Sequence, residues 1–114
     1  LAPQTTNGIT YVSGGVGDDE VAALQQVRGQ YRLHLLFAVQ GNGEYLADLP
    51  VTIANAQGLT LLQATSDGPF FFANLPAGTY RITATAEVSA ITRTVMVPSS
   101  GGVEERFYWT EQPR

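Results

Sequence analysis

The stretch that decides the fold reads YRLHLLFAVQ and spans residues 31–40. Its apolar residues recur at every second position, and successive side chains of a β-strand point to opposite faces. The sequence therefore predicts a β-strand here, with one strongly apolar face. That face carries Tyr31, Leu33, Leu35, Phe37 and Val39.

Shorter strand-like runs flank this stretch on both sides. They span residues 9–12, 51–54, 59–65, 70–73, 79–87, 91–97 and 103–109. Turn residues, mainly glycine, proline, asparagine and serine, separate almost every pair of runs. This regular spacing is typical of a sandwich or barrel, and we expect a mainly β antiparallel sandwich of about seven or eight strands.

One helix is predicted near the N-terminal end, over residues 19–28. Asp18, Asp19 and Glu20 stand where a helix has unpaired N–H groups and the positive end of its dipole. Apolar residues follow at helical spacing, and Gly29 occupies a position where helices often end in the left-handed conformation. We expect this helix to pack on the sandwich.

Several predicted strands are apolar on both faces, as in Leu35-Leu36-Phe37 and Phe70-Phe71-Phe72. A sheet with one solvated face should alternate more cleanly. The predicted helix can cover part of the second face. Any apolar surface left over would form a patch of the kind that marks a binding surface.

The length of 114 residues and the 44% of apolar residues fit one folded domain. We assign residues 9–114 to this domain. Residues 1–8 are polar and contain Pro3 and the Asn7-Gly8 pair, so we expect a flexible arm that ends in a turn.

The charges exclude several classes of function. Ten acidic and six basic residues give a net charge of -4, which disfavours nucleic acid as a partner. All six basic residues are arginines, so a phosphate-loop lysine and a lysine Schiff base are excluded. Cysteine is absent, which excludes disulfides and thiolate chemistry. The longest apolar run, residues 35–39, is too short for a membrane-spanning helix.

The second half of the chain carries a series of turn motifs. They are Val51-Thr52-Ile53 before Gln57-Gly58, then Thr65-Ser66-Asp67-Gly68, Phe70-Phe71-Phe72, and Leu75-Pro76-Ala77-Gly78-Thr79-Tyr80. In the last block Leu75 can fill the core, while Pro76 fixes the turn. Gly78 can adopt positive φ, and Tyr80 can bury its ring while its hydroxyl ties down a loop.

These motifs resemble those of the carboxypeptidase regulatory-like domains, over about half of the chain. The first 40 residues lie outside that pattern and resemble small bacterial exported proteins. The resemblance implies the transthyretin-type (prealbumin-like) β-sandwich, with Asp67 and Gly68 in a structural turn. Members of this wider fold act as accessory, adhesion, stability or sugar-binding modules. The implied role is therefore structural or binding.

Two groups of residues suggest chemistry that we weigh against plainer interpretations. Asp18, Asp19 and Glu20 could hold calcium, but they lack the alternate spacing of the common calcium loop, which favours helix capping. His34 is the only histidine and lies within a strand, without a nucleophile motif or a set of metal ligands. We therefore expect no catalytic residues, no metal and no cofactor.

The aromatic run Phe107-Tyr108-Trp109 allows two interpretations. Tyr108 and Trp109 could form a platform for a sugar ring. The alternation of residues 103–109 also fits a closing strand that buries Phe107 and Trp109 and leaves Tyr108 outside, and we favour this second interpretation.

The leading functional prediction is a non-enzymatic interaction or structural module of a bacterial envelope or secreted protein. Its partner would be a protein, bound through a sheet face or a loop end; a carbohydrate-binding module is the alternative. The chain starts at Leu1 without an initiator methionine, as an exported mature protein would, so the expected location is periplasmic or secreted.

Overall fold

A computed structural model describes residues 1–40 and 46–110 of the chain. In these residues it has nine strands, one α-helix and one 3₁₀ turn. The elements are β1 (Gln4–Thr6), β2 (Ile9–Gly14), α1 (Asp18–Val27), η1 (Arg28–Gln30), β3 (Leu33–Gln40), β4 (Leu49–Asn55), β5 (Thr60–Ser66), β6 (Phe70–Ala73), β7 (Gly78–Ala86), β8 (Ser89–Val97) and β9 (Val103–Thr110). The predicted mainly β fold is confirmed, and all eight predicted strands are present.

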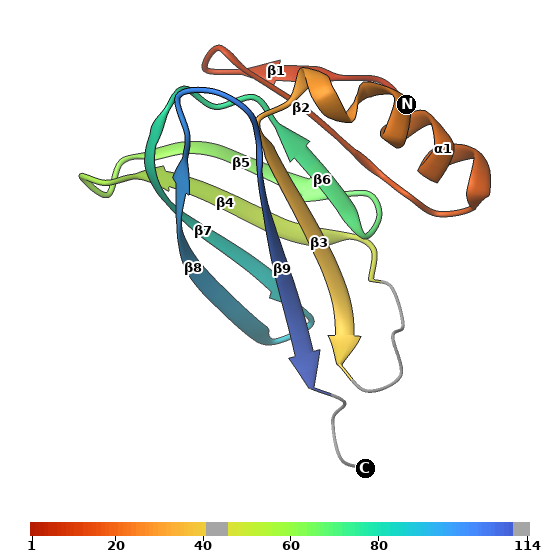
Figure 1. Cartoon of the computed structure of the whole chain (residues 1–114). Helices are drawn as coiled ribbons and strands as arrows, with labels where there is room; N and C mark the ends of the chain where they lie inside the picture. The colour runs from red at the N-terminus through yellow and green to blue at the C-terminus, as the bar shows by residue number, and fades with distance from the viewer. Residues whose placement is uncertain (41–45, 111–114) are drawn as a thin grey trace.

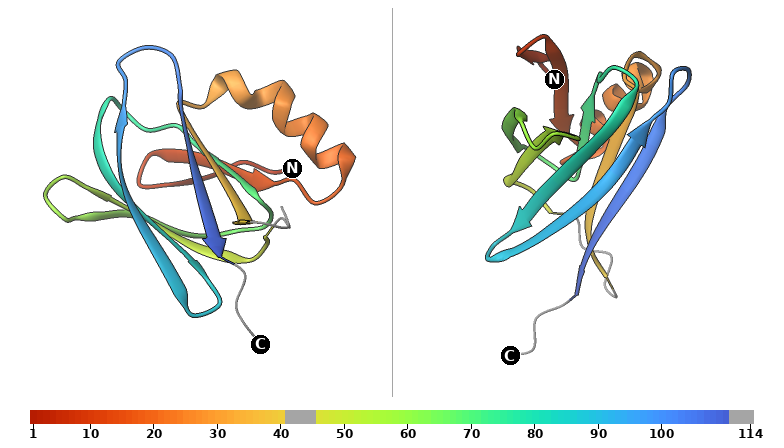
Figure 2. Two further views of the ribbon diagram at one scale, coloured as in Figure 1. Left: turned by 60° about the horizontal axis from the view of Figure 1, so that its bottom comes forward. Right: turned by 90° about the vertical axis from the view of Figure 1, so that its left-hand side faces the viewer.

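The strands form two sheets that lie face to face (Figures 1 and 2). The five-stranded sheet has the order β1-β2-β6-β3-β9, and the four-stranded sheet has the order β5-β4-β7-β8. Neighbouring strands are antiparallel, as predicted, except β3 and β9, which run parallel over their whole length. The prediction of an entirely antiparallel sandwich was therefore wrong for this pair, because the sequence pattern of a strand does not specify its neighbour. This is a sandwich-like arrangement with one helix against its five-stranded side.

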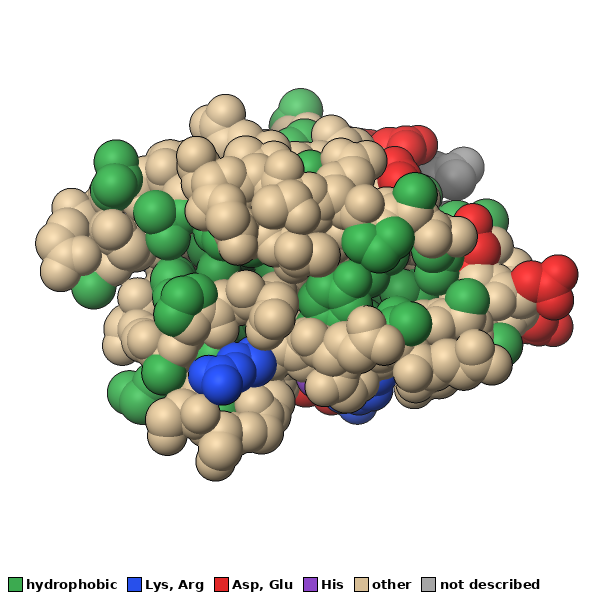
Figure 3. Space-filling model, turned by 90° about the horizontal axis from the view of Figure 1, so that it is seen from above, with side chains coloured by type: hydrophobic (Ala, Val, Ile, Leu, Met, Phe, Trp, Pro, Cys, Tyr) green, Lys and Arg blue, Asp and Glu red, His purple; other side chains and the backbone are tan. Residues whose placement is uncertain are grey.

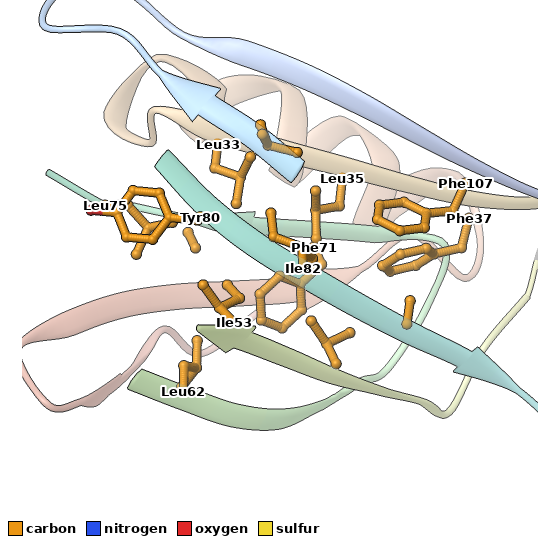
Figure 4. Close-up of a cluster of buried hydrophobic side chains, with 14 of the residues drawn as sticks. Leu33, Leu35, Phe37, Ile53, Leu62, Phe71, Leu75, Tyr80, Ile82 and Phe107 are labelled. Atoms are coloured by element: carbon orange, nitrogen blue, oxygen red, sulfur yellow. The ribbon is translucent and has the colours of Figure 1, made fainter. Parts of the chain in front are cut away.

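The main core fills the space between the two sheets (Figure 4). Leu33, Leu35 and Phe37 of β3 are almost fully buried there, as the alternation of residues 31–40 predicts. Phe107 of β9 and Phe71 of β6 join them from the same sheet, and β4, β5 and β7 supply aliphatic side chains from the other.

Tyr31 departs from the predicted face. It precedes β3 and packs instead in a second cluster, outside the five-stranded sheet, with Val12, Leu24 and Phe72. The reason is that β3 begins only at Leu33, so the alternation of that strand does not extend back to Tyr31.

The helix α1 covers the upper part of this outer face, as expected from the apolar second face of the strands. Leu24 is its one buried residue, and it contacts the cluster that contains Phe72. The prediction for Gly29 was wrong, because the chain continues into the 3₁₀ turn η1, where the N–H of Tyr31 donates to the carbonyl of Arg28 (3.2 Å). No helix within the described residues is long and apolar enough to cross a membrane.

The first eight residues contain a strand where a flexible arm was predicted. Residues Gln4–Thr6 form β1, which pairs with β2 at the edge of the sheet. The predicted turn at Asn7 and Gly8 is present, and both residues have positive φ (53° and 76°). The side-chain amide of Asn7 also donates to the carbonyl of Leu61 (2.7 Å), which links this hairpin to the second sheet.

The motif of residues 75–80 has the structure predicted for it. Leu75 is buried in the core, and Tyr80 is buried with its hydroxyl donating to the carbonyl of Pro76 (2.7 Å). Gly78 has a φ of 155°, which side-chain-bearing residues rarely adopt. The motif thus fixes the connection from β6 to β7.

The turn that contains Asp67 and Gly68 holds the two sheets together through a hydrogen bond to β2 and a close contact between two backbones. The backbone N–H of Asp67 donates to the hydroxyl of Ser13 on β2 (2.9 Å), and the hydroxyl of Ser66 donates to the carbonyl of Gly68 (2.7 Å). A β-carbon at Gly68 would collide with the backbone of Gly14. Glycine is required here by a close approach of two backbones.

Candidate functional site

Tyr108 and Trp109 lie on opposite faces of β9 and do not form an aromatic platform. Trp109 is only 6% exposed, stacks on Phe107, and donates its ring N–H to the carbonyl of Ser89 (2.9 Å). Tyr108 is 42% exposed on the outer face. The prediction of a closing strand with Trp109 in the core is confirmed, and Trp109 is not available to a ligand.

The acidic residues Asp18, Asp19 and Glu20 form the first turn of α1. The carboxylate of Glu20 accepts hydrogen bonds from the backbone N–H groups of Gly15 (3.0 Å) and Val16 (3.1 Å). Glu20 therefore holds the loop that enters the helix, like the glutamate of a capping box. In the described part of the chain, no three side chains of metal-ligating type lie together.

His34 lies on the outer face of β3, beneath the end of the helix. Its Nε2–H donates to the carbonyl of Arg28 (2.9 Å), and its ring packs edge-on against Phe72. The imidazole is 7% exposed, and burial lowers its pKa, although the hydrogen bond to Arg28 acts in the opposite direction. The neutral ring is a structural part of this region.

A hollow lies beside His34, at the end of the molecule where η1, the end of β6 and the start of β9 meet. Its lining includes Arg28, Gln30, Arg32, His34, Asn74 and Gly102. The parallel pairing of β3 and β9 places the 98–102 loop next to the start of β3, and the N–H of Val103 donates to the carbonyl of Arg32 (2.7 Å).

Gly102 keeps this hollow open. A β-carbon at this position would lie 3.0 Å from Cε1 of His34 and 3.3 Å from the carbonyl oxygen of Arg32. Both distances are shorter than normal packing contacts. A larger residue would therefore narrow the hollow.

One rim of the hollow carries a network of ion pairs. The carboxylate of Glu104 accepts hydrogen bonds from Arg28 (3.1 Å) and Arg106 (3.0 Å). Burial raises the pKa of Glu104, but the hydrogen bonds from the two arginines outweigh it and leave the pKa below its usual value. The Arg28 guanidinium also lies over the ring of Phe72.

Within the described residues, Arg32 lacks such an acidic partner. Its guanidinium donates one weak hydrogen bond, to the carbonyl of Pro98 (3.3 Å). Among the arginines that the structure describes, Arg32 and Arg81 make no salt bridge. Arg81 is exposed on the other sheet, whereas Arg32 is half-buried in the hollow.

The charges are unevenly distributed at this end of the molecule. Figure 3 shows the molecule from above; basic side chains appear near its lower edge, with acidic atoms directly beside one of them, and further acidic side chains lie toward the right. Among the described residues that line the hollow, the charged ones are Arg28 and Arg32, on a chain with a net charge of -4.

The sequence singled out His34 but not the hollow around it. The lining residues come from segments 25–34, 74 and 101–102, which are far apart in the chain. The one local signal was the pair Arg28 and Arg32, four residues apart, the first at the start of η1 and the second just after it.

No protein-family model matches this chain, and no curated protein is significantly similar to it. Any function must therefore follow from the residues themselves.

Proposed function

We propose that this chain is a non-enzymatic interaction module that binds a protein partner at its loop end, in the hollow beside His34. The observation that carries the proposal is Arg32, a half-buried residue in the hollow whose guanidinium has no acidic partner within the described residues. A charge that is partly removed from water without a partner costs stability. A bound group that pairs with it would offset this cost.

The open shape of the hollow favours a macromolecular partner. It lies between the 98–102 loop, Asn74 and η1, and Gln30, Asn74 and Gly101 are exposed around it. A protein can contact these rims while it places one side chain inside the hollow. Small-molecule sites are usually more enclosed and more apolar.

A rigid frame supports this assignment. The carbonyls of Arg28 and Arg32 are fixed by hydrogen bonds to Tyr31, His34 and Val103. A site whose backbone is fixed before binding loses less conformational entropy when the partner arrives.

The finer fold and the location belong to the same proposal. We infer a transthyretin-type sandwich from the turn at Asp67 and Gly68 and from the block of residues 75–80, whose side chains have the roles that the resemblance implies. A periplasmic or secreted location in bacteria stays a prediction from the sequence. A carbohydrate-binding role has little support, because Trp109 is buried.

Affinity capture with paired baits tests the proposal. The chain, an Arg32→Gln variant and an Arg81→Gln variant are used as baits in envelope and secreted extracts of the source organism. We expect at least one protein to be retained by the unmodified chain and by Arg81→Gln, and to be lost with Arg32→Gln. Retention of the same proteins by all three baits would exclude the hollow as the binding site.

A further inference from the structure

We infer that the hollow binds a carboxylate of the protein partner, with Arg32 as the residue that holds it and Arg28 beside it. This inference rests on the proposed function and names the chemical group that enters the hollow.

Within the described residues, Arg32 has hydrogen-bond donors without an acceptor. A guanidinium carries five N–H groups in a planar fork, and the structure assigns one of them, Nη1, to the carbonyl of Pro98. A carboxylate can accept two parallel hydrogen bonds from such a fork, which gives both strength and a fixed orientation.

The surroundings strengthen this pairing relative to an ion pair on an open surface. Arg32 is half-buried, and the neighbouring His34 is buried. Attraction between opposite charges increases where less water surrounds them. Exposed ion pairs such as that between Arg93 and Glu105 (3.7 Å) contribute little by comparison.

The number of available positive charges favours a singly charged ligand. Arg28 is already paired with Glu104, so Arg32 is left to neutralise one negative charge. A phosphate dianion would need Arg28 as well, and Arg28 would then have to leave Glu104. The amide side chains of Gln30 and Asn74 in the lining supply neutral hydrogen-bonding groups around a carboxylate.

Nuclear magnetic resonance titrations with short peptides test the inference. The first probe is an acetylated and amidated tripeptide with a central glutamate between two alanines. The second is acetylated trialanine with a free C-terminus, which separates a terminal carboxylate from a side-chain carboxylate. The control peptide carries glutamine in place of glutamate, and inorganic phosphate is the competing anion.

We expect at least one carboxylate peptide to cause saturable shifts of the backbone amide signals of Asn74, Gly101 and Gly102, and added salt to weaken them. The Arg32→Gln variant should bind about tenfold more weakly, whereas Arg81→Gln should bind as the unmodified chain does. Arg32→Lys keeps the charge but loses the planar fork of donors, so its affinity should lie between that of Arg32→Gln and that of the unmodified chain.

Three results would overturn the inference: equal shifts with the glutamine peptide, unchanged affinity of Arg32→Gln, or tighter binding of phosphate than of both peptides. If Arg32→Gln does not fold, Gly102→Ala replaces it, because its methyl group would narrow the hollow and weaken binding.

The two proposals can fail separately. If the Arg32→Gln bait loses a captured protein but no peptide binds to the chain, the inferred carboxylate ligand is contradicted. The proposed interaction module is then still supported. Peptide binding at Arg32, with no captured protein that distinguishes the baits, would support the carboxylate site and contradict a protein-binding role.

Discussion

The outer faces of the two sheets are made compatible with water in different ways. The four-stranded sheet directs eight of the chain's twelve threonines outward, and Arg81 is the one charged residue on that face within the described residues. These threonines are Thr52, Thr60, Thr65, Thr79, Thr83, Thr85, Thr92 and Thr94. The outer face of the five-stranded sheet is apolar around Val12 and Phe72 and is covered by α1.

The difference shows how the candidate site arises. A polar face needs no cover, because threonine combines high strand propensity with a hydroxyl that water can solvate. An apolar face must be shielded from water, here by a helix, and the shielded area stops where that helix ends. The hollow lies where the cover ends, beside η1, so the half-buried Arg32 meets solvent there next to the buried His34.

The comparison predicts that the covered face is far more sensitive to truncation. Leu24→Ala would remove the one buried side chain of α1 and leave a cavity against Val12 and Phe72. Buried leucine-to-alanine changes cost about 2 to 5 kcal/mol, and we expect about 3 kcal/mol here. Urea denaturation measures the loss, and a loss below about 1 kcal/mol would mean that the helix contributes little to the fold.

A second prediction concerns the contact between the two sheets. Gly68→Ala would drive a methyl group into the backbone of Gly14 and should cost about 2 kcal/mol, within the range for overpacking. Gly29→Ala is the matched control, because a β-carbon at Gly29 meets no atom within 4 Å. Equal midpoints of thermal unfolding for the two variants would contradict the close approach.

The third prediction is a pH dependence that originates on the covered face. Burial lowers the pKa of His34 in the folded chain, below its unfolded value of about 6.5. The neutral ring therefore favours folding above that pH, and stability is lost as the pH falls from there toward the folded pKa. We expect a lower urea midpoint at pH 5.5 than at pH 7.5.

His34→Gln separates this effect from that of other groups. The variant keeps a side-chain N–H donor but cannot gain a proton, so its midpoint should change little between these pH values. Glu104 does not interfere, because its lowered pKa contributes stability that is lost only below its unfolded value of about 4.5. If the urea midpoint of His34→Gln still falls from pH 7.5 to pH 5.5 as in the unmodified chain, the pH dependence comes from another group.

The smallest effect is expected on the threonine face. Thr92→Ala would remove the hydroxyl contact with Thr83 across β7 and β8 (2.8 Å). Cross-strand pairs of this kind contribute about 0.2 to 1 kcal/mol, and we expect a loss of about 0.5 kcal/mol by urea denaturation. A loss as large as that of Leu24→Ala would remove the distinction between the two faces.

The sequence was sufficient to predict the strands whose apolar residues alternate or cluster. Leu33, Leu35 and Phe37 of β3 and the block at Leu75 and Tyr80 have side chains whose burial follows from local pattern. The strand β1 could not be predicted in this way, because its residues are exposed and polar and it forms through pairing with β2.

The helix end and the hollow depend on distant contacts. Gly29 is a typical helix terminator by itself, but the carbonyl of Arg28 accepts hydrogen bonds from both Tyr31 and His34, which favours the 3₁₀ turn. The hollow requires Gly102 beside His34, and only the pairing of β3 with β9 brings them together. No local pattern reports such a contact.

The parallel pairing of β3 and β9 also has a consequence for the kinetics of folding. Leu33 pairs with Val103, so most of the other strands lie between these partners along the chain. The entropy cost of closing such a long loop must be met before the pairing of β3 and β9 contributes any stability. Such non-local pairing slows folding. During synthesis β9 leaves the ribosome after the other eight strands, and until then Phe37 lacks the contact with Phe107 that completes its burial. The chain therefore passes through a stage with one uncovered sheet edge, at which chaperone binding or aggregation would compete with folding.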